Sequence, residues 1–98
     1  MTFKVHPVAA YENILHSGAQ LVDVREPDEV AASTLPEAVN IPLSEFADRY
    51  TELDAARPVV LLCRSGARSG QAAGFLAANG FHDVTNLEGG MLAWADRD

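Results

Sequence analysis

Residues 59–69 read Val59-Val60-Leu61-Leu62-Cys63-Arg64-Ser65-Gly66-Ala67-Arg68-Ser69, and this stretch decides the fold. Its four leading apolar residues, two of them β-branched, indicate a strand buried on both faces, as in a parallel sheet. The Ala- and Gly-rich segment 69–79, followed by Gly80, predicts a helix that packs close to that sheet. A buried strand, a short loop and a helix together form a βα unit.

The rest of the chain repeats this alternation of short β-branched runs and helical stretches. We expect further strands at residues 2–5 (an edge strand), 21–24, 38–41 and 83–87. We expect further helices at residues 7–17, 28–32, 44–50 and 91–95. The pattern predicts an α/β fold with a mostly parallel sheet, and the length of 98 residues predicts a single domain over residues 1–98.

The chain is acidic, with 14 acidic and 7 basic residues and a formal net charge of -7. A nucleic-acid-binding surface carries the opposite sign, and anionic membranes would repel this chain. We therefore expect neither nucleic acid nor membrane as a partner. An anionic substrate would need local positive charge, which makes the arginines beside Cys63 informative.

Cys63 stands where a buried strand ends and a helix begins, which is where sites form in open α/β sheets. The first N–H groups of that helix lack intrahelical partners, and Gly66 allows the loop to turn them inward as an anion-binding nest. The helix dipole, Arg64 and Arg68 add positive charge. A thiol in this field should ionise readily, and the thiolate is the nucleophile.

Cys63 is the only cysteine, so no intramolecular disulfide can form. The N-terminal residues lack the apolar core of a signal peptide, and the longest apolar run, 59–63, is far too short to span a bilayer. We expect a cytoplasmic location, where a free thiol survives. No cluster with metal-ligand spacing is visible, so we expect no metal.

Four ordered segments that cover nearly the whole chain resemble one family. Residues 63–69 are similar to the active-site loop of rhodanese-like sulfurtransferases. Residues 21–26 resemble that family's strand with an Asp-Val-Arg signature, and residues 35–42 resemble its next segment. Residues 79–81 and 87–90, together with Trp94, resemble its C-terminal signature.

The resemblance implies a single rhodanese-like domain, with a five-stranded, mostly parallel sheet and helices on both faces. It implies that Cys63 takes sulfur from a small anionic donor such as thiosulfate, becomes a persulfide, and passes the sulfur to cyanide, a small thiol or a protein thiol. It places Asp23 and Arg25 in support of a substrate loop formed by Arg64, Ser65, Gly66, Ala67, Arg68 and Ser69. No cofactor is needed for this reaction.

The spacing within the loop separates this family from its relatives. Four residues lie between Cys63 and Arg68, one fewer than in related phosphatase and arsenate-reductase loops, so the loop suits a sulfur atom better than a phosphate. The basic loop favours thiosulfate over mercaptopyruvate as donor. Besides the enzyme, a carrier that delivers persulfide sulfur to a partner protein stays open. An intact Cys63 argues against a non-catalytic interaction domain, and the loop length argues against a phosphatase.

Some positions differ from the family pattern. Ser33-Thr34 stands where the family often has Gly-His, and residues 35–38 replace its Ile-Pro-Gly-Ala. Glu37 in place of glycine predicts a changed turn there. These positions lie outside the cysteine loop, so they concern partner contacts more than the chemistry.

The charged residues near the site allow two roles each. Arg25 either helps to bind the anion or pairs with Asp23 at the strand end, and we favour the pair. One of Arg64 and Arg68 would meet the donor. The other would brace the loop through a carboxylate, with Asp23 and Glu26 as candidates.

The remaining polar and aromatic candidates are assigned more simply. Ser65 and Ser69 either donate to the persulfide or cap the helix, and for Ser69 we favour the cap. Trp94 is expected to pack on the sheet, with a place in the pocket wall as the alternative. We expect no imidazole base, because ordinary surface positions suit all three histidines, His6, His16 and His82.

Overall fold

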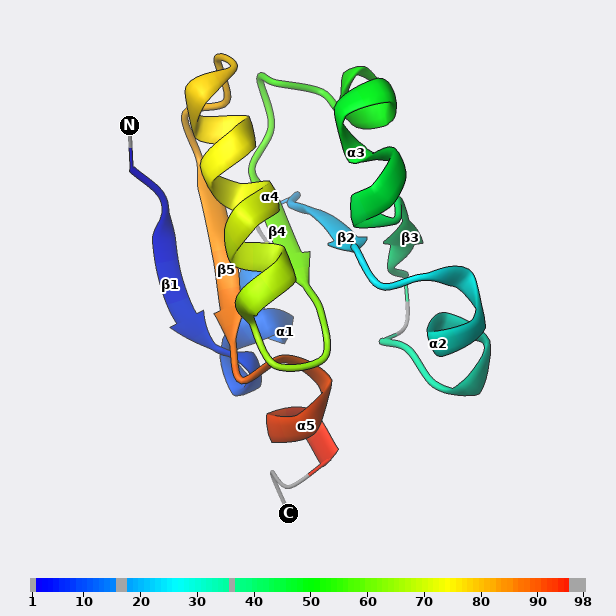
Figure 1. Cartoon of the computed structure of the whole chain (residues 1–98). Coiled ribbons are helices and arrows are strands. Elements are labelled where there is room, and N and C mark those ends of the chain that lie inside the picture. Colours follow the sequence, from blue (N-terminus) through cyan, green and yellow to red (C-terminus); the bar gives the residue numbers. More distant parts are fainter. Residues whose placement is uncertain (1, 16–17, 36, 96–98) are drawn as a thin grey trace.

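Five parallel strands form the central sheet, in the order β1-β5-β4-β2-β3 (Figure 1). The structure is a computed structural model that describes residues 2–15, 18–35 and 37–95. The strands are β1 (Lys4–Pro7), β2 (Gln20–Asp23), β3 (Val39–Asn40), β4 (Val59–Leu62) and β5 (Val84–Glu88). All four residues of β4 are buried and β4 lies in the middle of the sheet, as its apolar sequence predicts. The predicted parallel α/β fold is confirmed.

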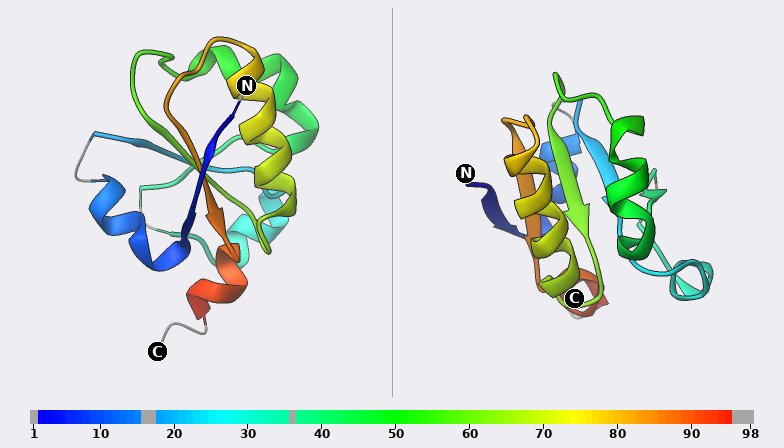
Figure 2. Two further views of the ribbon diagram at one scale, coloured as in Figure 1. Left: turned by 90° about the vertical axis from the view of Figure 1, so that its left-hand side faces the viewer. Right: turned by 45° about the horizontal axis from the view of Figure 1, so that its top comes forward.

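Helices cover both faces of this sheet, which also confirms the expectation (Figure 2). The 3₁₀ turn η1 (Val8–Ala10) and helix α1 (Tyr11–Leu15) lie on one face. Helices α3 (Leu43–Arg49) and α4 (Ala67–Ala78) lie on the other, with the 3₁₀ turn η2 (Tyr50–Glu52) after α3. The two short helices α2 (Pro27–Ala32) and α5 (Gly90–Ala95) lie at the end of the sheet to which β4 and β5 point (Figure 1).

The side chains of β4 divide between two apolar clusters because successive residues of a strand point to opposite faces. Val59 and Leu61 belong to the cluster under α3 and α4, where Phe46 and Leu76 are also buried. Val60 and Leu62 belong to the cluster on the opposite face, with Val8, Tyr11 and Leu87. Cys63 continues the first series, so its side chain lies on the side of the sheet that α4 covers.

Several predicted boundaries shift by one to three residues. The predicted first strand at 2–5 runs from Lys4 to Pro7 instead, and the helix predicted at 7–17 begins with a 3₁₀ turn at Val8, because Pro7 has an extended backbone (φ -63°, ψ 149°). The strand predicted at 38–41 is only Val39–Asn40, and Pro42 forms the N-cap of the next helix. Helix α4 begins at Ala67 and not at Ser69, because Gly66 forms its N-cap.

The turn before β3 contains Glu37, which has a φ of 69°. This is the left-handed region, which costs a side-chain-bearing residue energy and suits glycine. Glutamate thus occupies a backbone conformation that glycine would adopt without strain. The neighbouring Pro36 lies outside the described residues.

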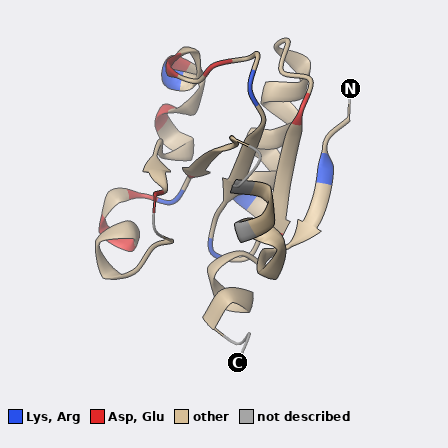
Figure 3. Cartoon of the chain, turned by 180° about the vertical axis from the view of Figure 1, so that it is seen from behind, with Lys and Arg blue, Asp and Glu red and all other residues tan. Residues whose placement is uncertain are grey.

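Acidic residues are distributed over α2, α3 and several loops (Figure 3). Lys and Arg occupy fewer positions than Asp and Glu do across the whole sequence, 7 against 14. Among the described residues, no helix has the length and apolar character needed to cross a membrane.

Candidate active site

The cysteine loop lies at the carboxyl end of β4, in the middle of the sheet, and leads directly into α4 (Figure 1). Helix α5 lies beside this loop, and α2 lies at the same end of the sheet. Open α/β sheets bind ligands at the carboxyl ends of their strands. The predicted loop residues therefore occupy a position at which this class of fold forms its sites.

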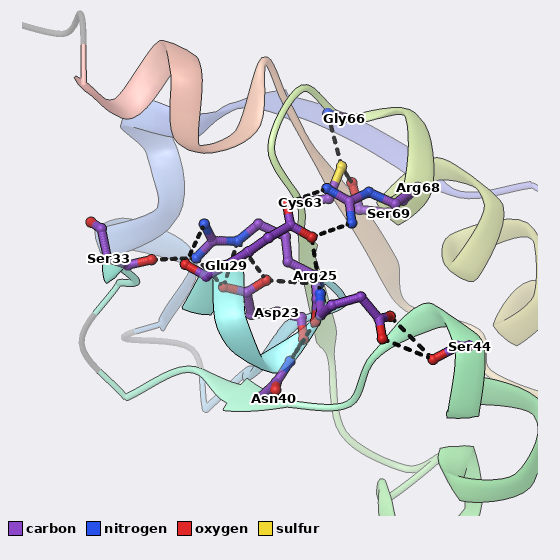
Figure 4. A network of polar contacts seen from close by, with 11 residues as sticks. Asp23, Arg25, Glu29, Ser33, Asn40, Ser44, Cys63, Gly66, Arg68 and Ser69 are labelled. Atoms are coloured by element: carbon purple, nitrogen blue, oxygen red, sulfur yellow. Dashed lines mark hydrogen bonds and ion pairs between the residues drawn. The ribbon is translucent and has the colours of Figure 1, made fainter. Parts of the chain in front are cut away.

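The sulfur of Cys63 is buried and accepts hydrogen bonds from the loop that follows it (Figure 4). The backbone N–H of Gly66 lies 3.0 Å from Sγ, and the hydroxyl oxygen of Ser69 lies 3.3 Å away. Burial by itself raises the pKa of the thiol, but the Ser69 hydroxyl and the N–H groups of Ser69, Gly66 and Ser65 together lower that pKa. At a given pH, the reactive thiolate is thus a larger fraction of Cys63 than of a free cysteine.

The first turn of α5 holds the cysteine loop through the backbone. The N–H groups of Met91 and Leu92 donate to the carbonyl oxygens of Cys63 and Arg64, at 2.9 and 3.0 Å. Gly90 permits this approach, since a Cβ on it would lie 2.1 Å from the Cys63 carbonyl oxygen, and its φ is 53°. With these carbonyls bound to α5, the loop presents N–H groups to the sulfur.

The loop arginine Arg68 braces the loop against α2 (Figure 4). Its Nη1 and Nη2 donate to Oε1 and Oε2 of Glu29, at 2.6 and 2.8 Å. The bond from Arg68, with one from the backbone N–H of Glu26, lowers the pKa of Glu29 to about 2. The prediction that one arginine braces the loop through a carboxylate is confirmed, but the predicted partners, Asp23 and Glu26, were wrong. Asp23 is engaged by Arg25, and Glu26 accepts from the hydroxyl of Ser44.

The other loop arginine, Arg64, is exposed, as are Ser65 and Ala67. The guanidinium of Arg64 makes no ion pair or hydrogen bond with any residue that the structure describes. The backbone N–H of Gly66 donates to the sulfur, as expected for stabilisation of the thiolate by the loop backbone. Neither arginine donates a hydrogen bond to the sulfur, so each can act on it only through its charge.

Asp23 and Arg25 form a buried ion pair at the end of β2. The Asp23 carboxylate accepts from Nε and Nη2 of Arg25, at 3.0 and 2.8 Å, and from the Thr34 hydroxyl at 2.9 Å. Arg25 also donates to the backbone carbonyl of Ser33. These contacts favour the structural pairing over direct anion binding, because the guanidinium is already occupied by protein acceptors.

Ser69 lies inside the first turn of α4, fully buried, and does not cap the helix. The preference for a cap was wrong because Gly66, with a φ of 105°, takes the N-cap position. The Ser69 hydroxyl instead lies between the Cys63 sulfur and the side-chain amide of Asn86. The distance from the Ser69 hydroxyl oxygen to Oδ1 of Asn86 is 2.5 Å. The amide of Asn86 donates to the carbonyl of Gly66 at 3.0 Å. Asn86 was not predicted from the sequence, although an asparagine within a strand is a signal because strands are depleted in this residue.

A hollow of about 460 Å³ opens beside the loop, between α5 and α2. Met91, Leu92, Trp94 and Ala95 form its apolar side, and Arg25, Glu29, Ser33 and Arg64 form its polar side. Trp94 also packs edge-on against Tyr11, with ring centroids 4.7 Å apart, so it both covers the sheet and borders the hollow. Both roles considered for Trp94 are therefore present.

The two histidines that the structure describes lie outside the cysteine loop. His6 and His82 are exposed, on β1 and in the turn before β5, and His16 lies outside the described residues. Within the described part of the chain, no three His, Cys, Asp or Glu side chains are grouped so that they could hold a metal ion.

A family model described as a rhodanese-like domain matches residues 7–97. A sulfurtransferase of Allochromatium vinosum is 45% identical over 75 residues, which cover 76% of this chain and 70% of the relative. The thiosulfate sulfurtransferase GlpE of Pseudomonas syringae is 35% identical over 92 residues, which cover 94% of this chain and 87% of the relative.

A solved structure gives the same assignment. The rhodanese-like domain protein of Staphylococcus aureus superposes with a TM-score of 0.85 at 33% sequence identity, over 94% of this chain and 91% of that protein. The likeness therefore extends over nearly the whole chain.

Proposed function

The chain belongs to the rhodanese-like domain family, and we propose that it transfers sulfane sulfur from thiosulfate, or a similar donor, through a persulfide on Cys63 to a thiophilic acceptor. One observation carries this proposal: the sulfur of Cys63 receives the N–H of Gly66 at 3.0 Å and lies 3.3 Å from the Ser69 hydroxyl. Such donors stabilise a thiolate and any negative charge that develops on the sulfur.

The first step loads the cysteine. The Cys63 thiolate attacks the outer sulfur of thiosulfate, a new S–S bond forms, and the bond between the two donor sulfurs breaks. Sulfite leaves with the electron pair of that bond, and Cys63 becomes a persulfide anion. The N–H groups of the loop receive the charge that moves to the outer sulfur.

The second step unloads it. A nucleophilic acceptor such as cyanide attacks the outer sulfur of the persulfide, the S–S bond of the persulfide breaks, and the Cys63 thiolate returns with the electron pair. No other redox partner enters either step, so the reaction needs no cofactor. A reducing compartment such as the cytoplasm would keep the free thiol available.

Arg64 is the residue that we assign to the donor. It is exposed beside the hollow and has no carboxylate partner among the described residues, whereas Arg68 is held by Glu29. A guanidinium can bind two oxygens of a sulfonate-like group at once. Arg68 then acts by keeping the loop closed around the sulfur.

A carrier that hands its sulfur to a partner protein is the second candidate. The apolar side of the hollow, with Leu92 47% exposed, supports it, because a protein acceptor needs an apolar contact next to the persulfide. The enzyme and the carrier share the loading step and differ only in the acceptor. Dependence of the unloading rate on a protein thiol, with small thiols and cyanide slow, would favour the carrier.

The test follows the mass of the protein and the appearance of thiocyanate. Incubation of the reduced protein with thiosulfate should add one sulfur atom to Cys63, and later addition of cyanide should release that sulfur as thiocyanate. Because Cys63 is the only cysteine, the mass gain has a single possible thiol site.

Two variants control this experiment. Cys63→Ser should gain no sulfur, and Arg64→Gln should load about tenfold more slowly at low thiosulfate concentration because it lacks the charge that binds the donor. Wild-type protein that never gains sulfur, or Cys63→Ser that works as well as wild type, would refute the proposal. Turnover of a phosphate ester would instead support the phosphatase that the loop length disfavours.

A further inference from the structure

Asn86 of β5 makes two hydrogen bonds in the site that the proposed reaction does not use. It is 7% exposed, its Nδ2 donates to the Gly66 carbonyl at 3.0 Å, and its Oδ1 lies 2.5 Å from the Ser69 hydroxyl oxygen. A backbone carbonyl can only accept a hydrogen bond, so the amide must turn its nitrogen to Gly66. Its oxygen therefore faces Ser69 and can only accept there.

The Ser69 hydroxyl has one proton and two acceptors within reach, Oδ1 of Asn86 and Sγ of Cys63. When the proton lies in the short contact with Asn86, a lone pair of Ser69 faces the sulfur. That arrangement suits a neutral thiol, whose S–H donates to Ser69. A thiolate needs the opposite arrangement, in which the hydroxyl rotates and donates to sulfur while the buried Oδ1 loses its donor.

We propose that Asn86 is a positioning residue that controls the ionisation of Cys63 by competing for the Ser69 proton. The inference deepens the proposed function, because the thiolate is the nucleophile of that reaction. Asn86 stabilises the thiol state, and Ser69 stabilises the thiolate once its proton leaves Asn86.

The charged groups around the sulfur do not change when Asn86 is replaced by leucine or alanine. They are Arg64 on the loop, Arg68 on α4, Asp23 at the end of β2 with Arg25 just after it, and Glu29 on α2, which pairs with Arg68. On β5 the charged residue is the exposed Glu88, and α5 carries none. The Gly66 carbonyl keeps a partner without Asn86, since it also accepts from the N–H of Gly70 at 3.0 Å. A change in the pKa of Cys63 on replacement of Asn86 would thus come from a change in the hydrogen bond of the Ser69 hydroxyl.

The test compares Asn86→Leu, which is similar in size but has no polar atoms, with and without Ser69→Ala. The rate of alkylation by iodoacetamide as a function of pH gives the pKa of the single thiol. Asn86→Leu should raise the thiolate fraction below that pKa by about threefold to tenfold, and Ser69→Ala should lower it by a similar factor. In the Ser69→Ala background, Asn86→Leu should change nothing. Asn86→Ala tests the same point if leucine does not fit against Gly70.

Asn86→Asp loses the same amide donor to Gly66 but keeps an acceptor for the Ser69 proton. Because it also adds a negative charge near the sulfur, the effect of that charge is measured separately, as the change that Asn86→Asp causes in the Ser69→Ala background. After subtraction of that charge effect, Asn86→Asp should leave the thiolate fraction unchanged or lower it, whereas Asn86→Leu raises it. A merely structural tether predicts the same direction for both variants, and that result would overturn the proposal, as would a leucine effect that persists without the Ser69 hydroxyl. The assay uses no sulfur donor, so a protein that titrates as expected but gains no sulfur would refute only the proposed function.

Discussion

At the scale of single residues, the carboxylate of Asp23 is the most demanding group near the site. It is fully buried and receives the guanidinium of Arg25, itself 6% exposed, together with the hydroxyl of Thr34. Removal of one partner of such a pair leaves the other charge buried and uncompensated. The pair therefore holds the end of β2 in place beside the cysteine loop.

Asp23→Asn should lower the free energy of unfolding by about 3–5 kcal/mol, since the Arg25 charge would remain buried without its counter-ion. Urea unfolding followed by circular dichroism measures this loss. Arg49→Gln is the control, because Arg49 forms its ion pairs with Glu45 and Glu52 at the surface, where such pairs contribute about 1 kcal/mol or less. Equal losses for the two variants would contradict the buried role of Asp23.

At the scale of elements, β4, α4 and α5 act together on the loop. Strand β4 brings the cysteine to the middle of the sheet, α4 supplies the N–H groups, and α5 binds the carbonyl oxygens on the other side. The loop is thus held through its backbone, and the residue that allows the approach of α5 is Gly90.

Gly90→Ala should remove most of the sulfur-loading activity and destabilise the protein by about 2 kcal/mol or more, because its methyl group would collide with the Cys63 carbonyl oxygen and its φ is positive. Gly74→Ala is the matched control within α4, where a Cβ meets only a ring carbon of Phe3, at 4.0 Å. This control should be stabilised by about 0.5–1 kcal/mol and stay active. Thermal unfolding measures the stability of both variants, and the mass of the persulfide measures their sulfur loading. A fully active Gly90→Ala would show that the close approach of α5 to the cysteine loop is not needed for loading.

At the scale of the whole molecule, the ion pair of Arg68 with Glu29 joins α4, on one face of the sheet, to α2 at its end. The pKa of Glu29 falls from 4.5 to about 2, mainly through the hydrogen bond from Arg68 and also through the backbone N–H of Glu26. A carboxyl with a lowered pKa in the folded state stabilises the fold fully above its unfolded pKa. That contribution is lost as the pH falls through the folded value.

Wild-type protein should therefore lose about 1–2 kcal/mol of stability from Glu29 between pH 4.5 and 2, a value reduced because the side chain is 30% exposed to screening water. Glu29→Gln should already lack this contribution at neutral pH and show a flatter acid dependence. Urea unfolding at a series of pH values measures both slopes. Glu45→Gln is the surface control, and an unchanged slope in Glu29→Gln would show that the pair does not stabilise the fold.

The sequence by itself determined the order of strands and helices along the chain, the parallel α/β class, the burial of β4 on both faces and the place of Cys63 at the end of that strand. Local information suffices for these, because apolar runs, β-branched residues and glycine stops act within a few positions. Only the tertiary structure decided that Arg68 pairs with Glu29, that Ser69 faces both the sulfur and Asn86, and that Gly90 admits α5 to the loop. These contacts join residues up to 39 positions apart, and their geometry depends on how the layers pack and not on any spacing along the chain.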